Sequence, residues 1–290
     1  MFIATLIAAE RLSAGDISTA QDAFGASMIS RNWIDEGRAC DIRFSGDAAA
    51  ARVALEGLIE GVDVIVQVEA ERRRKLIVAD MDSTMITIEC IDELADYAGI
   101  KPQIAEVTER AMRGELDFED ALRSRVALLK GLPETVIEQC LRERVTIMPG
   151  AKELIRTMRA NGGQAVLVSG GFTRFAEPVG HEIGFHQAIA NQLGIANGAL
   201  DGTVVGNIVG AQTKRDTLLA SLAERSWSAS DALAVGDGAN DIPMIEAAGL
   251  GVAYHAKPKT AAAAGACIQF NDLTAILYAM GYPRAAWVMD

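Results

Sequence analysis

The sequence has few of the features that mark secreted or membrane proteins. Its 290 residues include only four cysteines, and none form a C-x-x-C pair, so neither a disulfide framework nor a zinc site is indicated. No apolar run approaches the roughly 20 residues that a membrane-spanning helix needs. The apolar stretch Phe2–Ala9 has no basic leader and is cut short by Glu10 and Arg11, so we expect no signal peptide. Reduced thiols in the cytoplasm are the expected state.

Positive charge is also scarce. Lys and Arg number 27 against 39 Asp and Glu, which gives a formal net charge of −12 at pH 7. Such a surface opposes general binding to nucleic acid or to anionic membranes. We therefore expect a small-molecule substrate, and an anionic one must meet a few local cations.

Several nucleotide and metal motifs are missing. No G-x-x-x-x-G-K-[ST] occurs, which excludes a P-loop NTPase, and the glycines near Gly236 lack the G-x-G-x-x-G dinucleotide spacing. His181 and His186 flank Glu182, but their spacing does not match the H-E-x-x-H of a zinc protease helix. We interpret both histidines as surface or core residues.

Residues 1–74 predict a small domain of their own. Strand and helix patterns follow in the order βαββαβ, which is that of a ferredoxin-like sandwich. The expected ranges are Phe2–Ala8, Ser13–Gly25, Ser27–Ile34, Ala39–Ser45, Ala48–Glu60 and Val62–Val68. This order resembles ACT-type regulatory domains, which often bind amino acids, so an effector site and a homodimerisation or interaction surface both stay open. The charged stretch Glu69–Lys75 is the expected boundary.

The stretch Lys75–Thr84 organises residues 75–290. Its apolar run, Leu76–Ala79, suits a strand buried on both faces of a parallel sheet. The run ends in Asp80 and Asp82, and in open α/β sheets ligands bind outside the carboxyl ends of the strands. The two acids are thus well placed to take part in a reaction. An Asp-rich turn or a helix cap would give the same sequence pattern.

Residues 85–148 predict a helical insertion. The helical segments are Glu89–Ala98, Lys101–Arg113, Phe118–Leu129 and Glu134–Arg142. Placed directly after the strand that carries Asp80, they would form a lid over the active edge. Glu89 and Arg125 lie among apolar residues. Taken alone, they fit a helix start favoured by the dipole and an exposed salt bridge.

From residue 149 the strand–helix alternation resumes, which predicts a doubly wound parallel sheet. The strand Gln164–Val168 leads into Ser169-Gly170-Gly171, where backbone N–H groups and a helix start suit phosphate, or form a plain turn. The strand Ala232–Val235 leads into the loop Gly236–Asp241, whose oxygen-bearing side chains suit Mg²⁺.

A lysine follows a predicted rim hairpin over Gln192–Val209. Thr213 and Asp216 predict a capping box, which puts Lys214 in the first helical turn, where a cation opposes the helix dipole. Locally unfavourable residues are more expected at functional sites. Lys214 is therefore either aimed at a phosphate or solvated.

Side chains suited to phosphate or metal chemistry thus follow four strand ends or helix starts, in a specific order. They are D-M-D-S-T from Asp80, Ser169, Lys214 and G-D-G-A-N-D from Gly236. Together they resemble the haloacid dehalogenase superfamily of phosphotransferases over about Lys75 to the C-terminus. The additional presence of Glu89, Phe118 with Arg125, and V-S-G-G-F resembles its phosphoserine phosphatase family. The resemblance implies an α/β core with a helical cap, and a Mg²⁺-dependent hydrolysis of O-phospho-L-serine to serine and phosphate.

The resemblance also implies how the reaction is divided. Asp80 would be the nucleophile that becomes an aspartyl phosphate, and Asp82 the general acid and then base. Mg²⁺ would be held by Asp80, the backbone carbonyl of Asp82, and Asp237.

Further roles are implied for phosphate and substrate binding. Ser169, the N–H of Gly170 and Lys214 would hold the phosphoryl oxygens, while Asn240 and Asp241 position the loop or the metal's waters.

In the cap, the same resemblance has Glu89 bind the serine ammonium and Arg125 its carboxylate, with Phe118 excluding water. Two alternatives stay open. One is a phosphotransferase that passes the phosphoryl group to another amino-acid hydroxyl such as homoserine, and the other is a non-catalytic amino-acid sensor.

Overall fold

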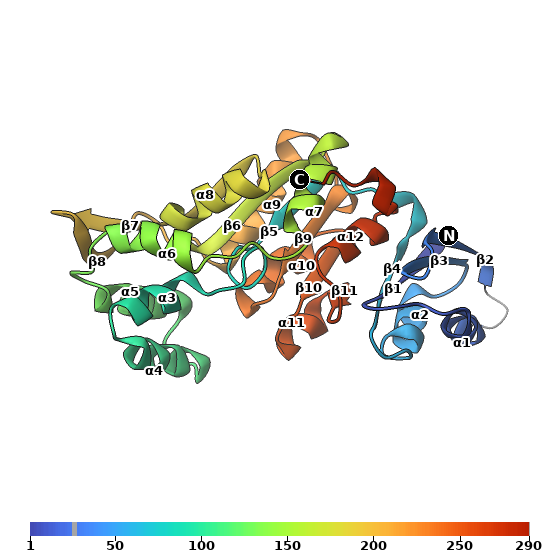
Figure 1. Ribbon diagram of the computed structural model, residues 1–290, viewed down its shortest axis with the longest axis horizontal. Coiled ribbons are helices and arrows are strands. Elements are labelled where there is room, and N and C mark those ends of the chain that lie inside the picture. The colour runs from blue at the N-terminus through green and yellow to red at the C-terminus, as the bar shows by residue number, and fades with distance from the viewer. Residues whose placement is uncertain (25–27, 290) are drawn as a thin grey trace.

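In a computed structural model the chain forms two sheets side by side, each with its own helices (Figure 1). The structure describes residues 1–24 and 28–289. The N-terminal sheet has the strand order β2-β3-β1-β4, and the larger sheet has the order β11-β10-β9-β5-β6-β7-β8. In the described ranges, no helix is long and apolar enough to span a bilayer.

The N-terminal part confirms the predicted βαββαβ order. Its elements are β1 (Phe2–Ala8), α1 (Ala14–Phe24), β2 (Met28–Asp35), β3 (Ala39–Phe44), α2 (Ala48–Leu55) and β4 (Val62–Val68). The strands pair antiparallel, as an ACT-like fold requires. Helix α2 ends five residues before the predicted Glu60, because Gly57 takes a left-handed φ of 73°. The predicted element ends at Gly25 and Ser27 lie outside the described residues.

The larger sheet is doubly wound, as predicted. Its strands are β5 (Leu76–Ala79), β6 (Gln164–Phe172), β7 (Gln187–Ala196), β8 (Ala199–Val205), β9 (Ala232–Gly236), β10 (Leu250–Tyr254) and β11 (Ala266–Ile268). The central strand β5 lies between β9 and β6, and all four of its residues are fully buried. Helices cover both faces of this sheet: α7 (Ala151–Ala160), α8 (Thr173–Ile183) and α12 (Thr274–Ala279) on one, and α9 (Ala211–Glu224), α10 (Ile242–Ala247) and α11 (Pro258–Ala263) on the other.

The hairpin predicted over Gln192–Val209 begins earlier in the structure. Strand β7 begins at Gln187, pairs parallel with β6 and only then turns antiparallel to β8, so the sheet is mixed at this edge. The first half of β7 was missed because its small apolar residues, Ala188 and Ala190, give a weak pattern next to Asn191.

Two local predictions were also wrong. Strand β6 does not end at Val168 but continues through a bulge to Phe172. Helix α9 begins at Ala211 with Gly210 as its N-cap, so Thr213 and Asp216 form no capping box. Thr213 instead occupies the third helical position, where its Oγ1 faces the Gly210 N–H at 3.5 Å.

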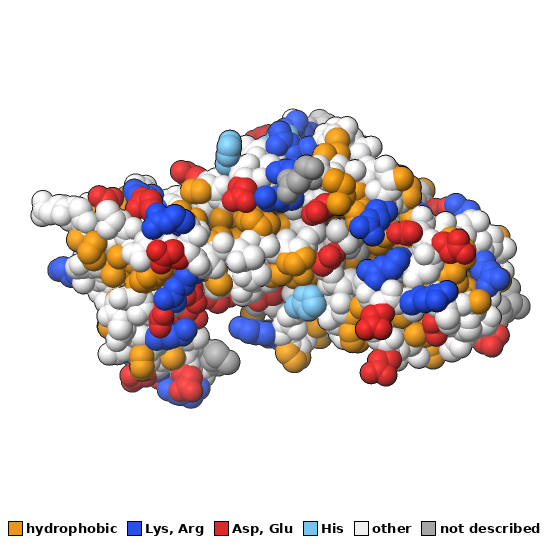
Figure 2. Space-filling view, viewed as in Figure 1, with side chains coloured by type: hydrophobic (Ala, Val, Ile, Leu, Met, Phe, Trp, Pro, Cys, Tyr) orange, Lys and Arg blue, Asp and Glu red, His pale blue; other side chains and the backbone are white. Residues whose placement is uncertain are grey.

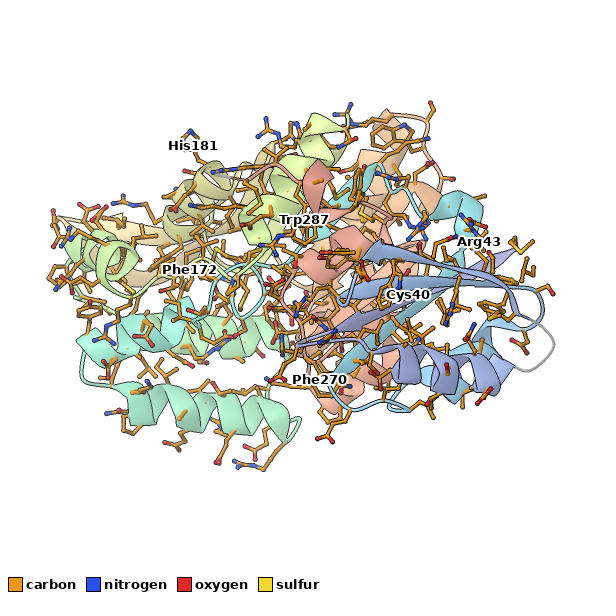
Figure 3. All side chains as sticks on the ribbon, turned by 45° about the vertical axis from the view of Figure 1, so that its right-hand side comes forward. Cys40, Arg43, Phe172, His181, Phe270 and Trp287 are labelled. Carbon is orange, nitrogen blue, oxygen red and sulfur yellow. The ribbon has the colours of Figure 1, made fainter. Side chains whose placement is uncertain are left out.

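The predicted helical insertion between β5 and β6 is confirmed. Its helices are α3 (Cys90–Tyr97), α4 (Lys101–Met112), α5 (Phe118–Leu128) and α6 (Thr135–Glu143). Helices α3, α4 and α5 project below the sheet in Figure 1. Figure 2 shows a hollow between this cap and the core, with acidic side chains at its upper margin. His181 and His186 are both exposed, and His181 points outward in Figure 3.

The two sheets are joined by a buried carboxylate. Asp63 of β4 is 3% exposed and accepts hydrogen bonds from the backbone N–H groups of Gln269 (2.8 Å) and Asn271 (3.0 Å), which follow β11. The Asn271 amide donates to the carbonyl of Ile7 at 3.0 Å. Phe270, between these two residues, lies at the border of the two sheets in Figure 3. The contact is thus specific, because its polar groups are buried and paired.

We expect the Asp63→Ala substitution to lower the free energy of unfolding by about 2–3 kcal/mol, because it removes the acceptor for N–H groups of three consecutive residues, among them the buried Asn271. Urea unfolding of the full chain measures this. Asp22→Ala, on the exposed surface of α1, is the matched control and should change stability by less than about 0.5 kcal/mol. Equal effects of the two substitutions would contradict the assigned role of Asp63.

Candidate active site

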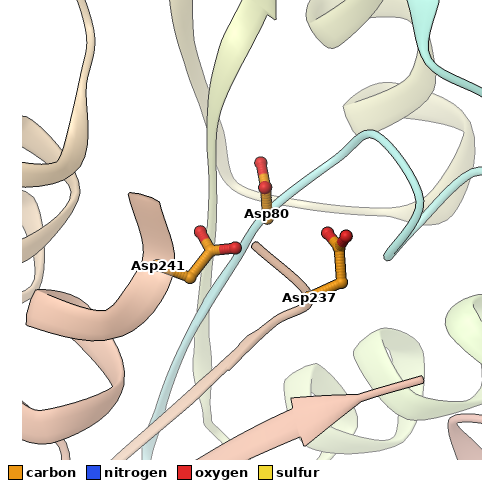
Figure 4. A group of neighbouring side chains, drawn as sticks. All are labelled: Asp80, Asp237 and Asp241. Carbon is orange, nitrogen blue, oxygen red and sulfur yellow. The ribbon is translucent and has the colours of Figure 1, made fainter. Parts of the chain in front are cut away.

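Three carboxylates meet at the carboxyl edge of the larger sheet. Asp80 follows β5, while Asp237 and Asp241 lie in the loop after β9 (Figure 4). One oxygen of each lies within 4.8 Å of the others. Adjacent parallel strands end at the same edge, which is why residues more than 150 positions apart in the sequence converge here.

Lys214, in the first turn of α9, reaches this cluster. Its Nζ lies 2.7 Å from Asp80 Oδ1 and 2.6 Å from Asp241 Oδ1, and Lys214 and Asp241 are both 0% exposed. Burial lowers the pKa of Lys214, but the two carboxylates outweigh this and its net pKa is raised. Of the two interpretations of Lys214, the solvated lysine is excluded.

The cluster carries more negative than positive charge. Burial, and then the Asp241 carboxylate, raise the pKa of Asp80 well above its usual value despite the Lys214 ammonium. Burial and the same neighbour raise the pKa of Asp237 to about 6. A divalent cation would remove this penalty, and carboxylate oxygens at this spacing are the donors that Mg²⁺ prefers. The donor set therefore fits a hard cation.

A glycine makes room for this arrangement. A Cβ on Gly236 would lie 2.3 Å from Asp241 Cγ, so a larger residue would displace the carboxylate. On the other side, the buried Thr84 hydroxyl lies 3.3 Å from Asp237 Oδ1. The loop after β9 is thus held by the D-M-D-S-T segment as well as by its own backbone.

Asp82 has a different environment from Asp80. Its carboxylate accepts from the backbone N–H and the thiol of Cys90, both at 3.2 Å. Cys90 is the first residue of α3, so the helix N-terminus faces the carboxylate. Burial, followed by the Glu89 charge, nevertheless raises the pKa of Asp82 to about 7. A carboxyl group with this pKa can donate and accept a proton near neutrality.

The lid brings an acid and a cation to the same region. The exposed Glu89 accepts a 2.7 Å hydrogen bond from the Ser83 hydroxyl, and Ser83 itself takes a left-handed φ of 57°, which is uncommon for a non-glycine residue. Burial lowers the pKa of Arg125, while the charges of Asp92, Glu89 and Asp82 act against this shift. Arg125 is thus half-buried beside the site acids rather than on an open surface.

The bulge of β6, Ser169 to Gly171, lies under the lid. Ser169 is 1% exposed, and its Oγ accepts from the Gly171 N–H at 2.9 Å. A Cβ built on Gly170 would lie 3.2 Å from Phe118 Cζ and 3.9 Å from Asn240 Nδ2, and one on Gly210 would lie 3.3 Å from Phe118 Cδ1. The Phe118 ring of the cap therefore rests on two glycines of the core, next to Asn240.

Asp80, Asp237, Asp241 and Lys214 meet at this edge, and the other residues predicted for the site lie around it: Asp82, Ser169, Gly170 and Asn240 in the core, and Glu89, Phe118 and Arg125 in the lid. Asp241 was expected to position the loop or the metal's waters, and its carboxylate both accepts from the Gly238 N–H at 3.0 Å and belongs to the oxygen cluster. Its place as the last acid of G-D-G-A-N-D was the available signal. The Cys90 thiol against Asp82 was not expected, and only its position directly after Glu89 could have indicated it.

Comparison with known proteins places these features in context. The haloacid dehalogenase-like hydrolase family matches residues 77–246. The phosphoserine phosphatase of Vibrio cholerae is 49% identical over 202 residues, which is 70% of this chain and 61% of that protein. The chain thus spans less than two thirds of this relative's length.

Solved structures agree with the fold. The unliganded "probable phosphoserine phosphatase from vibrio cholerae" has a TM-score of 0.80 and 38% identity, covering 98% of this chain and 88% of that one. A substrate-bound phosphoserine phosphatase complex has a TM-score of 0.66 and 38% identity, covering 71% of this chain and 98% of that one. The first likeness includes both sheets.

Removing the buried cation should destabilise the protein. We expect Lys214→Met to cost about 3–5 kcal/mol of unfolding free energy without divalent cations, because Asp80 and Asp241 lose their shared partner. Added Mg²⁺ should restore part of this loss. Lys75→Met is the control, since Lys75 is 54% exposed in its ion pair with Asp231 and should contribute less than about 1 kcal/mol. Urea unfolding with and without Mg²⁺ tests this, and a Lys214 variant as stable as the control would contradict it.

Proposed function

The chain belongs to the haloacid dehalogenase-like hydrolases, and from that premise we propose that it is a Mg²⁺-dependent phosphatase that hydrolyses O-phospho-L-serine to L-serine and phosphate. One observation carries the proposal: Asp80 and Asp82, two residues apart in the loop after β5, occupy different electrostatic environments. Asp80 lies beside a buried lysine, and Asp82 faces the N-terminus of the lid helix α3. This is the separation that a nucleophile and a proton donor require.

The reaction we propose has two steps. An Asp80 carboxylate oxygen attacks the phosphorus, the bond to the serine oxygen breaks, and Asp82 gives that oxygen its proton. Asp82 then takes a proton from water as the water attacks the aspartyl phosphate, which releases phosphate and restores Asp80. The pKa of about 7 allows Asp82 to serve in both directions.

In this proposal the metal ion is held by carboxylate oxygens of Asp80, Asp237 and Asp241. The backbone carbonyl of Asp82, a ligand that the family resemblance implies, is a further donor. When bound, Mg²⁺ offsets the negative charge of the phosphoryl group and of the nucleophile. Ser169, the Gly170 N–H and Lys214 bind the phosphoryl oxygens in this proposal. Donors fixed before the reaction stabilise charge that develops in the transition state.

Substrate choice is assigned to the lid. Glu89, which is exposed towards solvent, binds the ammonium group, and the planar guanidinium of Arg125 binds the carboxylate. Phe118 is 37% exposed while it rests on Gly170 and Gly210, so it has free area to cover a bound substrate. These three residues separate a phosphoserine enzyme from other small-molecule phosphatases.

We also infer that residues 1–74 form a regulatory or dimerisation domain, and that residues 75–290 form the phosphatase domain with a cap at about 85–148. The separate sheet with its own apolar core supports the first division. A cytoplasmic location is supported by the four free cysteines (Cys40, Cys90, Cys140 and Cys267).

The two acids should differ in how much activity they control. We expect Asp82→Asn to reduce phosphate release by about 10²–10⁴-fold, the usual value of general acid–base help, and to leave a slow enzyme. Asp80→Asn removes the group that forms the covalent bond and should leave no measurable turnover. Steady-state phosphate release measures both, and equal losses would refute the assignment of roles.

The substrate assignment predicts a ranking of phosphate esters. With Mg²⁺, L-phosphoserine should release phosphate much faster than phosphoethanolamine, which lacks the carboxylate, or 3-phosphoglycerate, which lacks the ammonium group. Arg125→Lys should narrow the difference between phosphoserine and phosphoethanolamine, because the planar fork is lost. Equal rates for the three esters would keep the phosphatase and remove phosphoserine as its substrate. Faster loss of phosphoserine on adding homoserine, with phosphohomoserine formed, would favour the transferase.

A further inference from the structure

Asn191 is a buried polar residue outside the proposed chemistry. It lies in β7 and is 1% exposed. Its Nδ2 donates to the carbonyl of Gly170 at 2.8 Å, and its Oδ1 accepts from the Val209 N–H at 2.8 Å. Nδ2 also lies 3.4 Å from the Val209 carbonyl. One carboxamide thus bonds to the main chain of two separate segments.

The first of these segments is the bulge of β6. Val168 pairs with Ile189 and Phe172 with Asn191, so β6 advances four residues while β7 advances two. The residues between, Ser169 to Gly171, are pushed out of the ladder, and the Gly170 carbonyl cannot take its normal place in it. Phe172, labelled in Figure 3, anchors the far end of the bulge in the core. The Asn191 amide supplies the hydrogen bond that the ladder no longer provides.

The second segment leads into the lysine helix. Val209 directly precedes Gly210, the N-cap of α9, which carries Lys214 in its first turn. The Asn191 carboxamide therefore fixes the spacing between the bulge, with Ser169 and Gly170, and the start of α9. Removing this buried carboxamide would leave backbone groups of both segments without a hydrogen-bond partner.

The same two segments contact the lid. Gly170 and Gly210 are the glycines on which the Phe118 ring rests. A shift of either segment would move both the phosphoryl donors and this contact.

We propose that Asn191 is a positioning residue for phosphate binding: its carboxamide holds the Ser169–Gly170 bulge and the N-terminus of α9 in the register that the phosphoryl group needs. This inference rests on the proposed function for its chemistry, but the binding of inorganic phosphate tests it without turnover. Asn191 acts through the segments that it joins.

The test compares Asn191→Ala with the full-length parent protein, using inorganic phosphate in the presence of Mg²⁺ as the probe. We expect the dissociation constant for phosphate, measured by calorimetry, to rise by about tenfold or more. Without the hydrogen bonds of Asn191, the proposed phosphate donors Ser169, Gly170 and Lys214 are no longer held in position. The rate constant kcat for phosphoserine should fall by a similar factor.

Asn271→Ala is the matched control. Asn271 is also a buried asparagine, 7% exposed, whose amide donates to a backbone carbonyl, that of Ile7, but it lies at the border with the N-terminal sheet. Its loss should lower the unfolding midpoint as Asn191→Ala does, and leave phosphate binding within about twofold of the parent. If Asn191→Ala does not fold, Asn191→Asp serves, since it keeps the acceptor for the Val209 N–H and loses only the donor.

The outcomes separate the two proposals. Phosphate binding that is equal in the folded Asn191 and Asn271 variants overturns the positioning role. A parent protein that binds phosphate with Mg²⁺ but releases none from phosphoserine overturns the proposed substrate. In that case the ratio of the phosphate dissociation constants of the Asn191 and Asn271 variants still decides whether Asn191 positions the site.

Discussion

The site depends on one buried ammonium group held between two carboxylates. Lys214 joins Asp80, at the end of β5, to Asp241, in the loop after β9, and both contacts are shorter than 3 Å. Charges buried at this depth are tolerated only when each is paired. The end of β5, the start of α9 and the loop after β9 must therefore assemble together, and the charge cluster at this edge is also part of what holds the sheet in place.

The same cluster sets how an anion can approach. Its three acids exceed its one cation, and the whole chain carries a charge of −12. A phosphate ester would meet net repulsion here, because a low-dielectric site amplifies charge. A divalent cation reverses the local balance without changing the surface. Burial and the Asp241 carboxylate raise the pKa values of Asp80 and Asp237, and a bound cation would oppose this shift.

The parts that were predictable from the sequence are those set by short-range pattern. The apolar run of β5 and the acids that follow it indicated both the central strand and the catalytic edge. The ends of lid helices were marked by Gly99, Gly114 and Gly131, glycines of the kind that terminate helices. The site residues themselves were named through a family resemblance, because nothing in the spacing of Glu89 or Arg125 distinguishes them from surface charges.

What could not be predicted is set by long-range geometry. The bulge in β6 depends on register against β7, and the first half of β7, up to Asn191, has a weak sequence pattern. The contact of Asp82 with the Cys90 N–H depends on how the chain turns back after the left-handed Ser83. Such features follow from pairing and packing, which no local window of residues contains.

In the proposed mechanism, these contacts make the lid part of the chemistry as well as a cover. Asp82 belongs to the core loop, yet the N–H and thiol that hold its carboxylate belong to α3, the first helix of the lid. At the opposite side, Phe118 of α5 rests on Gly170 and Gly210, whose segments Asn191 ties together. In that mechanism, a motion that lifts the lid would release Asp82 from its contacts with Cys90 and uncover Gly170 and Gly210 at once. Substrate recognition by Glu89 and Arg125 and proton transfer by Asp82 would then be coupled through the lid, because Glu89 is the N-cap of α3, Arg125 lies in α5 and Cys90 of α3 contacts Asp82.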